Sequence, residues 1–165
     1  YDKNIISEIA EKSGLSPEYI QESAELSPKK GLFAYALAGR DITGKSVEDM
    51  VYEAQRKVIL ELAEKESCVI IGRNADFILR DWNDVLNVFI HAALDYRIQR
   101  ATELYSLPQA TAGEQVLKND KRRANYYKYH AGDRWANMQN FDIAIRSDYG
   151  GIDHAVDCIE KFLNI

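Results

Sequence analysis

The stretch CVIIGRNAD, residues 68–76, decides the expected fold. Four consecutive apolar residues precede Gly72, and such a continuous run predicts a central parallel strand that is buried on both faces. Polar residues follow at once, namely Arg73, Asn74 and Asp76. In open α/β sheets, ligands bind beside the carboxyl ends of the strands. The stretch therefore predicts a binding site at this edge of the sheet.

The residue types in this polar group favour an anionic ligand. Gly72 permits close approach of the backbone, and the planar donor fork of Arg73 suits phosphate. Asn74 and Asp76 are expected to position a second group or the water of a metal ion. The alternative interpretation is a surface turn in which Arg73 forms an ordinary ion pair.

Strands and helices alternate along the rest of the chain. Residues 85–92 (VLNVFIHA) and 141–145 are further candidate strands. Amphipathic or charged patterns predict helices over residues 94–105, 107–118 and 152–163, and a capping box of Ser46 and Asp49 opens a long helix that ends near Lys65. The expected class is α/β, with a mainly parallel sheet flanked by helices.

Composition limits the class of protein. The chain has 165 residues, 46% of them hydrophobic and 28% charged, which suits one domain over residues 1–165. Its net charge of -5 argues against a general nucleic-acid binder. Two cysteines without metal-type spacing are expected to be reduced and buried. With no signal peptide and no membrane-spanning apolar run, we expect a cytoplasmic protein without membrane partners.

The stretch GRDITGKS, residues 39–46, matches the phosphate-loop pattern of two glycines five residues apart followed by Lys45 and Ser46. The preceding LFAYALA lacks the β-branched residues of a buried strand, and Asp41 would place a negative charge beside the phosphates. Two interpretations follow from the residues: a nucleotide phosphate loop, or a loop with a helix cap in which Lys45 is solvated.

Two groups of cations stand out in this acidic chain. Arg97 and Arg100 lie three residues apart, on one face of a predicted helix; a solvated face is the alternative. Residues 118–132 (KNDKRRANYYKYHAG) interleave cations with tyrosines. This pattern suits a polyphosphate clamp that closes over a nucleotide, an RNA-binding surface or a solvated helix, and the overall acidity argues against RNA.

Several separated strings together resemble the cytidylate kinase-like family of nucleoside monophosphate kinases. They are CVIIGRNADFILRD, NVFIHAALDYRIQRA, DKRRANYYKYHAGDRW and FDIAIRSD, with YDKNIISEIAEKSGL and AQRKVILELAEK before them. The resemblance covers most of the chain. No one string is specific by itself, but the set is.

The resemblance implies an adenylate-kinase-type P-loop kinase fold with a five-stranded parallel sheet. It also implies a monophosphate-binding helical region over residues 13–49 and a mobile lid over residues 107–132. In the family the phosphate loop lies upstream of a segment like the one that opens this sequence. The match at residues 39–46 is then fortuitous, and the first strand, the phosphate loop and the first helix of the family fold are expected to be missing from this sequence.

The resemblance further implies phosphoryl transfer from ATP to CMP or dCMP, with Mg²⁺. Arg73 matches the arginine of a Gly-Arg-Asp motif that contacts the acceptor phosphate, while Asn74 departs from that motif's aspartate and Asp76 is a possible substitute. The remaining matches are helix arginines and an Asp-x-Arg signature in the lid: Arg97, Arg100, Asp120, Arg122 and Arg123.

Taken together, catalytic roles are expected for Arg97, Arg122 and Arg123, and substrate binding for Arg73, Asn74, Asp76, Arg100 and Asp120. No residue is expected to bind a metal ion directly. A loose phosphoryl-transfer transition state needs positioning and charge stabilisation rather than a covalent nucleophile. The alternative is a non-catalytic nucleotide-binding or regulatory domain of the same fold.

Overall fold

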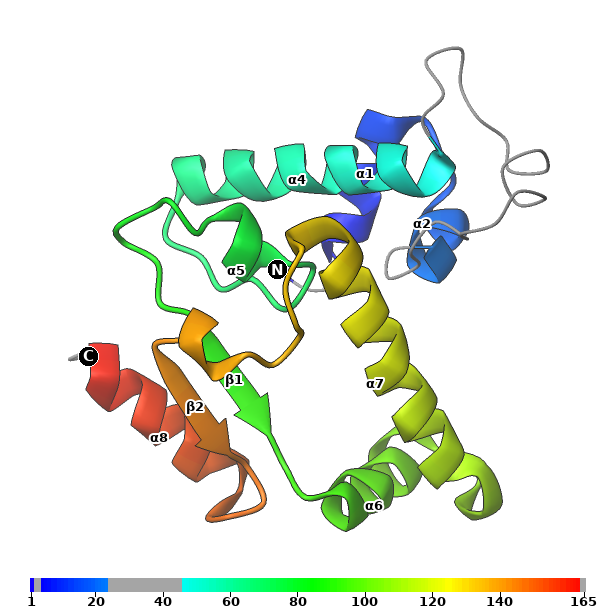
Figure 1. The fold of residues 1–165 in the computed structure, drawn as a ribbon, viewed down its shortest axis with the longest axis vertical. Coiled ribbons are helices and arrows are strands. Elements are labelled where there is room, and N and C mark those ends of the chain that lie inside the picture. Colours follow the sequence, from blue (N-terminus) through cyan, green and yellow to red (C-terminus); the bar gives the residue numbers. More distant parts are fainter. Residues whose placement is uncertain (2–3, 24–45, 164–165) are drawn as a thin grey trace. The chain divides into compact units, whose positions relative to one another are not determined.

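The computed structural model of this chain describes residues 1, 4–23 and 46–163 (Figure 1). These residues fall into two compact units. Unit 1 comprises Tyr1–Val85 and Asn125–Asp133, and unit 2 comprises Leu86–Ala124 and Arg134–Ile165. The described chain is mostly helical and includes a small parallel sheet, so the predicted α/β class is confirmed in this coarse form.

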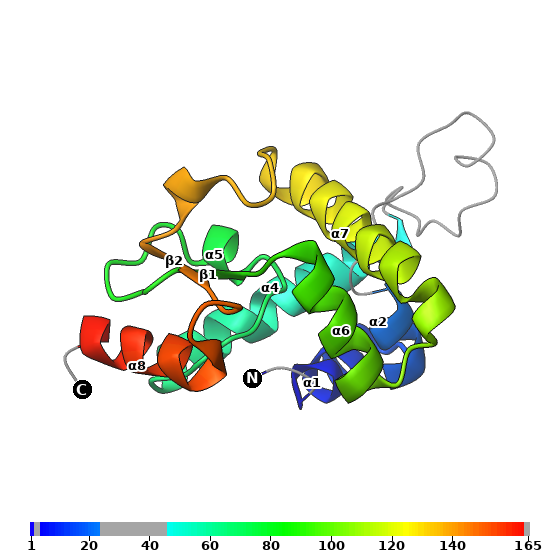
Figure 2. The same cartoon turned by 90° about the horizontal axis from the view of Figure 1, so that it is seen from below.

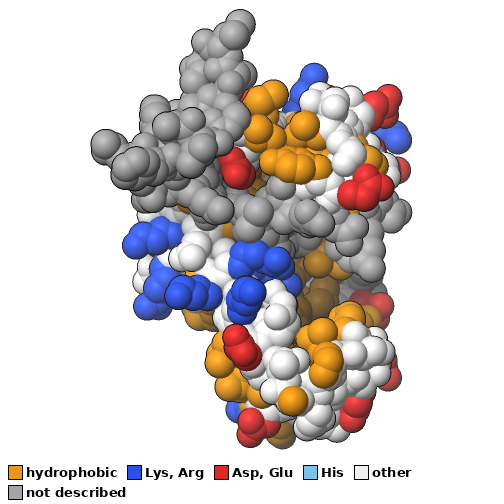
Figure 3. Space-filling view, turned by 90° about the vertical axis from the view of Figure 1, so that its right-hand side faces the viewer, with side chains coloured by type: hydrophobic (Ala, Val, Ile, Leu, Met, Phe, Trp, Pro, Cys, Tyr) orange, Lys and Arg blue, Asp and Glu red, His pale blue; other side chains and the backbone are white. Residues whose placement is uncertain are grey.

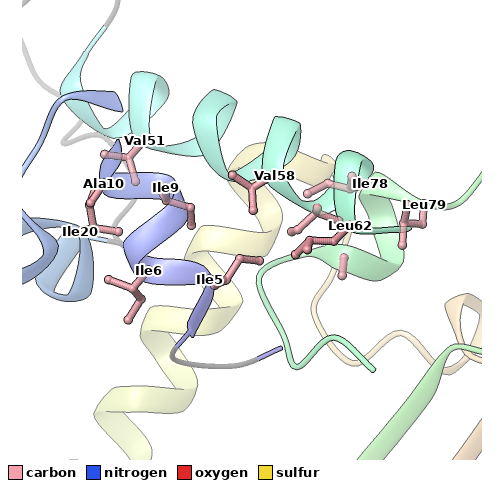
Figure 4. Packing of buried hydrophobic residues seen from close by; sticks show 12 residues of the cluster. Ile5, Ile6, Ile9, Ala10, Ile20, Val51, Val58, Leu62, Ile78 and Leu79 are labelled. Carbon is pink, nitrogen blue, oxygen red and sulfur yellow. The ribbon is translucent and has the colours of Figure 1, made fainter. Parts of the chain in front are cut away.

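Unit 1 is a helical unit around one apolar core. Its elements are α1 (Asn4–Ser13), α2 (Pro17–Ser23), α4 (Val47–Lys65), the short α5 (Ala75–Ile78) and the last turns of α7 (Gln109–Ala131). Helix α1 packs against α2 and α4. The buried side chains shown in Figure 4 include Ile5, Ile9 and Val58, which are fully buried. Burial of each such side chain contributes about 1.5–3 kcal/mol of hydrophobic free energy.

The predicted capping box is present at the start of α4. The Ser46 hydroxyl accepts a hydrogen bond from the Asp49 amide at 3.1 Å, and the Asp49 carboxylate accepts one from the Ser46 amide at 3.3 Å. These bonds satisfy backbone donors that have no partner within the helix. The helix ends at Lys65, as the sequence predicted.

The prediction of a buried central strand at residues 68–71 is wrong. The segment has no assigned strand, and Val69 and Ile71 are 76% and 59% exposed. Its backbone is bonded instead to Tyr1, whose amino group donates to the Val69 carbonyl and whose carbonyl accepts from the Ile71 amide. An apolar run indicates affinity for a buried position, but it becomes a central strand only where neighbouring strands lie on both sides.

Unit 2 contains the two-stranded parallel sheet. Strand β1 (Val88–His91) pairs with β2 (Ile143–Arg146) in a register that runs from Val88↔Ile143 to His91↔Arg146. Strand β1 lies within the predicted range 85–92 and is shorter than it. Strand β2 overlaps the predicted range 141–145 and ends one residue beyond it. The unit also contains α6 (Leu94–Tyr105), the 3₁₀ turn η1 (Met138–Asn140) and α8 (Gly151–Leu163). Among the described residues the sheet has two strands, so a five-stranded P-loop kinase sheet is not seen there.

Helix α7 is one continuous helix of 23 residues. The sequence predicted a helix over residues 107–118 followed by a separate basic run, and the structure joins the two. In unit 2 the start of α7 lies beside α6 (Figure 2), where a Cβ added at Gly113 would lie 3.3 Å from the Ile98 Cδ1. The absence of a side chain at Gly113 therefore permits this close packing.

Two predicted regions remain partly outside the described residues. Most of the expected monophosphate-binding region, residues 13–49, lies there, as does GRDITGKS apart from Ser46.

The expected lid, residues 107–132, is helical over almost its whole length. Both cysteines are free and half-buried, so the expectation of full burial is wrong.

Candidate functional site

The first candidate group lies in unit 1, at the turn that precedes α5. Three consecutive residues have positive φ angles: Gly72 at 69°, Arg73 at 60° and Asn74 at 55°. The left-handed conformation costs a residue with a Cβ roughly 1–2 kcal/mol. Such strain persists only where the surroundings impose it, and it clusters at ligand-binding sites. The turn that the sequence marked is therefore a constrained element of the fold.

Gln55 on α4 supports this turn. Its side-chain amide is fully buried and donates hydrogen bonds to the Arg73 carbonyl at 2.9 Å and to the Tyr126 hydroxyl of α7 at 3.0 Å. Gln55 is not among the residues predicted from the sequence. The available signal was its position, since Gln55 stands four residues from both Val51 and Ile59 on the buried face of α4. A lone amide on an apolar helix face requires hydrogen-bond partners in the core.

Three polar atoms around this turn are buried without a hydrogen-bond partner in the described part of the chain. They are the Gln55 Oε1, the Arg73 Nη1 and the Asn74 Nδ2. Arg73 as a whole is half-buried, and Asn74 is 7% exposed. Leaving a buried polar group unpaired costs about 1–3 kcal/mol. A polar ligand or a bound water molecule that paired with these atoms would recover that free energy.

Asp76 is close to the same turn but is already engaged. The Tyr127 hydroxyl of α7 donates to its Oδ2 at 2.7 Å. Arg73, Asn74 and Asp76 are thus neighbours along the turn and α5, and Gln55 of α4 contacts this turn at the Arg73 carbonyl. In this conformation one Asp76 oxygen helps to hold α7, which leaves Asp76 less suited to ligand binding than its neighbours.

A ring cluster flanks the Tyr126 side of this group. Tyr52 and His130 stack with centroids 3.7 Å apart and planes at 12°, and Tyr126 meets the His130 ring edge-on at 4.6 Å. Burial lowers the pKa of His130 to about 4, and the nearby Asp49 carboxylate offsets this only in part. His130 is therefore neutral at pH 7. Its role in the described structure is packing, because a neutral ring can stack in the interior without the free-energy cost of burying a charge.

The second candidate group lies in unit 2, between α6 and α7. The Nη1 of Arg97 donates to both carboxylate oxygens of Asp120, at 2.9 and 2.7 Å. The Arg97 Nε is buried and has no partner within the described ranges. The sequence predicted roles for both residues but not their pairing. The pair fixes the Arg97 side chain and neutralises much of its charge.

The other predicted arginines of unit 2 are more open. Arg100 is half-buried, with its guanidinium carbon 6.0 Å from the centre of the Tyr96 ring. Arg122 and Arg123 are exposed on α7. Figure 3 shows Lys and Arg side chains gathered on the side of the molecule along which α7 runs. This local positive surface is compatible with an anionic ligand despite the acidic total charge.

No group of three or more His, Cys, Asp or Glu side chains among the described residues is arranged to hold a metal ion. No helix in the same part of the chain has the length and apolar character needed to cross a membrane.

Residues 1–149 match the model of a family described as cytidylate kinase-like. A crystal structure of an uncharacterized protein from Eubacterium ventriosum ATCC 27560 is 28% identical, with a TM-score of 0.67 over 97% of this chain and 89% of that chain. No curated protein matches. The likeness to the solved structure indicates that the two proteins share a fold. The family match indicates a nucleotide kinase-like function in general.

Proposed function

Because the chain belongs to the cytidylate kinase-like family, we propose that it transfers a phosphoryl group from ATP to a nucleoside monophosphate, with CMP or dCMP as acceptor. Family membership supports a nucleotide kinase-like function in general. The turn at residues 72–74 is the observation that carries the finer proposal, because it holds a buried cationic donor and a buried amide donor without partners.

On the acceptor side, Arg73 and Asn74 bind the monophosphate. The guanidinium of Arg73 forms charge-assisted hydrogen bonds to the phosphate oxygens, which are stronger than neutral ones. Its Nη1 is already shielded from solvent and unpaired, so little ordering is needed when the anion arrives. The strained turn keeps the donor in place before the ligand binds.

Asn74 also bears on the choice of acceptor base. The corresponding aspartate in the family's motif can only accept hydrogen bonds when ionised, whereas an amide offers both an acceptor oxygen and a donor nitrogen. The Asn74 oxygen can accept a hydrogen bond from the amino group of cytosine, so asparagine at this position is compatible with CMP or dCMP. Asp76 is the weaker candidate for this contact because it accepts a hydrogen bond from Tyr127.

The arginines of unit 2 serve the transferring group. An oxygen of the acceptor phosphate attacks the γ-phosphorus of ATP, and the bond to the β–γ bridging oxygen breaks, giving ADP and the nucleoside diphosphate. Negative charge is spread over the transferring oxygens. Arg97, Arg122 and Arg123 stabilise that charge, Arg100 binds the donor phosphates, and Asp120 holds Arg97 by the two contacts described above.

Mg²⁺ enters with ATP in this proposal. Its preferred ligands are oxygens, and in kinase sites it keeps several waters and binds the substrate phosphates. The described residues contain no three-membered ligand cluster, and Asp120 is paired with Arg97. None of the described residues is therefore assigned to the ion.

A product assay tests the proposal. The full-length protein is incubated with ATP, Mg²⁺ and, separately, CMP, dCMP, UMP, AMP and GMP, and the nucleotides are separated by chromatography. We expect ADP and a diphosphate in equal amounts, fastest with CMP or dCMP. Nucleotide binding without any diphosphate would support the non-catalytic alternative, and absence of both binding and turnover would refute the proposal.

A further inference from the structure

The backbone of the Arg73 turn is held from α4 by a side chain that the proposed chemistry does not use. Gln55 is fully buried, and its Nε2 lies 2.9 Å from the Arg73 carbonyl oxygen. A backbone carbonyl that faces the interior needs a donor, since leaving it unpaired is costly. The turn meets part of its own needs, because the Ala75 amide donates to the Gly72 carbonyl. The Arg73 carbonyl takes its donor from Gln55.

The orientation of Gln55 is fixed by a second bond. Its amide group carries two hydrogens, and the second is donated to the Tyr126 hydroxyl at 3.0 Å. Tyr126 is itself buried, with its ring edge-on to Tyr52 at 6.2 Å and to His130 at 4.6 Å. Since the Arg73 carbonyl can only accept, the nitrogen of Gln55 must face it, which settles the orientation of the amide.

Local strain gives this support a consequence. Arg73 and Asn74 adopt φ angles of 60° and 55°, a left-handed conformation that is unfavourable for arginine and is tolerated better by asparagine. Without a donor at the Arg73 carbonyl, the turn would relax toward right-handed or extended conformations, and the side chains would point elsewhere. The position of the Arg73 guanidinium therefore depends on a contact to its backbone from outside the turn.

We infer that Gln55 is a positioning residue: it holds the left-handed turn that presents Arg73 to the acceptor phosphate, and Tyr126 of α7 fixes Gln55 in turn. The inference rests on the proposed function, because it assigns Arg73 to acceptor binding. It adds that the geometry of this arginine is set by α4 and by the last turns of α7.

A double-mutant cycle tests the inference. Gln55→Met keeps the length of the side chain but removes both donors, Arg73→Ala removes the guanidinium, and a third variant carries both changes. The probe is CMP, and its affinity for the full-length protein is measured by calorimetry. We expect Arg73→Ala to weaken CMP by about tenfold or more, equal to about 1.4 kcal/mol. Gln55→Met should weaken it by about three- to tenfold, and should have no further effect once Arg73 is absent.

A matched control separates positioning from loss of stability. Val58→Ala lies on the same helix, is also fully buried, and should lower the melting temperature without changing CMP affinity. Where Gln55→Met folds poorly, Tyr126→Phe serves as the milder variant, because it keeps the ring and removes one partner of Gln55. We expect it to weaken CMP by about two- to threefold, only when Arg73 is present. In steady-state kinetics, Gln55→Met should raise the KM for CMP and leave the KM for ATP unchanged.

Each result has a distinct meaning. Unchanged CMP affinity in Gln55→Met and Tyr126→Phe, with Arg73→Ala weakened, overturns the inference and leaves the proposed function in place. Additive effects of Gln55→Met and Arg73→Ala also overturn it, because Gln55 would then act independently of Arg73. Unchanged affinity in Arg73→Ala itself refutes the acceptor site and the inference together.

Discussion

Arg97 and Asp120 are 23 residues apart in the sequence, and the Nη1 of Arg97 contacts both oxygens of the Asp120 carboxylate at 2.9 and 2.7 Å. The two side chains are 33% and 23% exposed. At this exposure the pair contributes on the order of 1 kcal/mol or less to stability. Its larger effect is geometric, because the carboxylate fixes a long cationic side chain that has several other rotamers.

Asp120→Asn is expected to lower turnover by about tenfold, corresponding to about 1.4 kcal/mol in the activation free energy. The amide keeps one acceptor oxygen but loses the charge that holds Arg97. The melting temperature should change little. Steady-state kinetics and thermal unfolding measure the two effects. Glu114→Gln, an exposed carboxylate on the same helix, is the control, and equal turnover in both variants would show that the pair has no catalytic role.

Arg122→Ala is expected to reduce turnover by roughly a hundredfold while the KM values for ATP and CMP change little, because the contact is made in the transition state. Arg123→Ala should behave similarly if its side chain reaches the transferring group. The neighbouring exposed Lys121→Ala tests whether positive charge alone is responsible. If neither arginine variant loses turnover, the basic run of α7 is a surface feature without a catalytic contribution.

Lowering the pH should destabilise unit 1 through His130. Its pKa is about 4 in the folded protein because burial disfavours the charged ring, and about 6.5 when unfolded. The unfolded state therefore binds a proton first, and stability is lost as the pH falls from about 6.5 to about 4. Denaturant unfolding across this range measures the loss. His130→Phe keeps a ring against Tyr52 and should remove this component, and identical pH dependence in both proteins would contradict the assignment.

Ser46→Ala is expected to destabilise the protein by about 1 kcal/mol, the usual effect of removing an N-cap side chain. The Ser46 hydroxyl caps α4 through the Asp49 amide, and the capping-box interpretation assigns it no ligand. ATP affinity should therefore remain within about threefold of the parent, well under the tenfold that corresponds to about 1.4 kcal/mol. Thermal unfolding and calorimetry provide the two measurements. A large loss of ATP affinity with normal stability would instead support a phosphate loop at residues 39–46.

Local signals in the sequence predicted much of the secondary structure. Helix α6 begins and ends where its charge pattern indicated, at Leu94 and Tyr105, and the capping box located the start of α4. These signals are local, because capping and helical periodicity involve residues three or four positions apart. The family resemblance, carried by strings spread along the chain, agrees with the match over residues 1–149.

Interactions between distant residues were not predictable in the same way. The apolar run at residues 68–71 has the composition of a central strand, but Val69 and Ile71 are exposed. Strand formation depends on neighbouring strands, and composition does not specify these neighbours. The hydrogen bond from Gln55 to the Arg73 carbonyl and the ion pair of Arg97 with Asp120 likewise depend on tertiary packing. The sequence identified most residues of the candidate site, but not the contacts that hold them.

Transfer of labelled phosphate tests the central claim most directly. The full-length protein is incubated with CMP, Mg²⁺ and ATP labelled at the γ-phosphate, and the products are resolved over time. A nucleoside monophosphate kinase moves the label to the β-phosphate of CDP, and we expect this transfer to be lost to a large extent in Arg73→Ala. Label that stays in ATP, or that appears only as inorganic phosphate, both with CMP and in parallel reactions with dCMP, UMP, AMP and GMP, would contradict a kinase function.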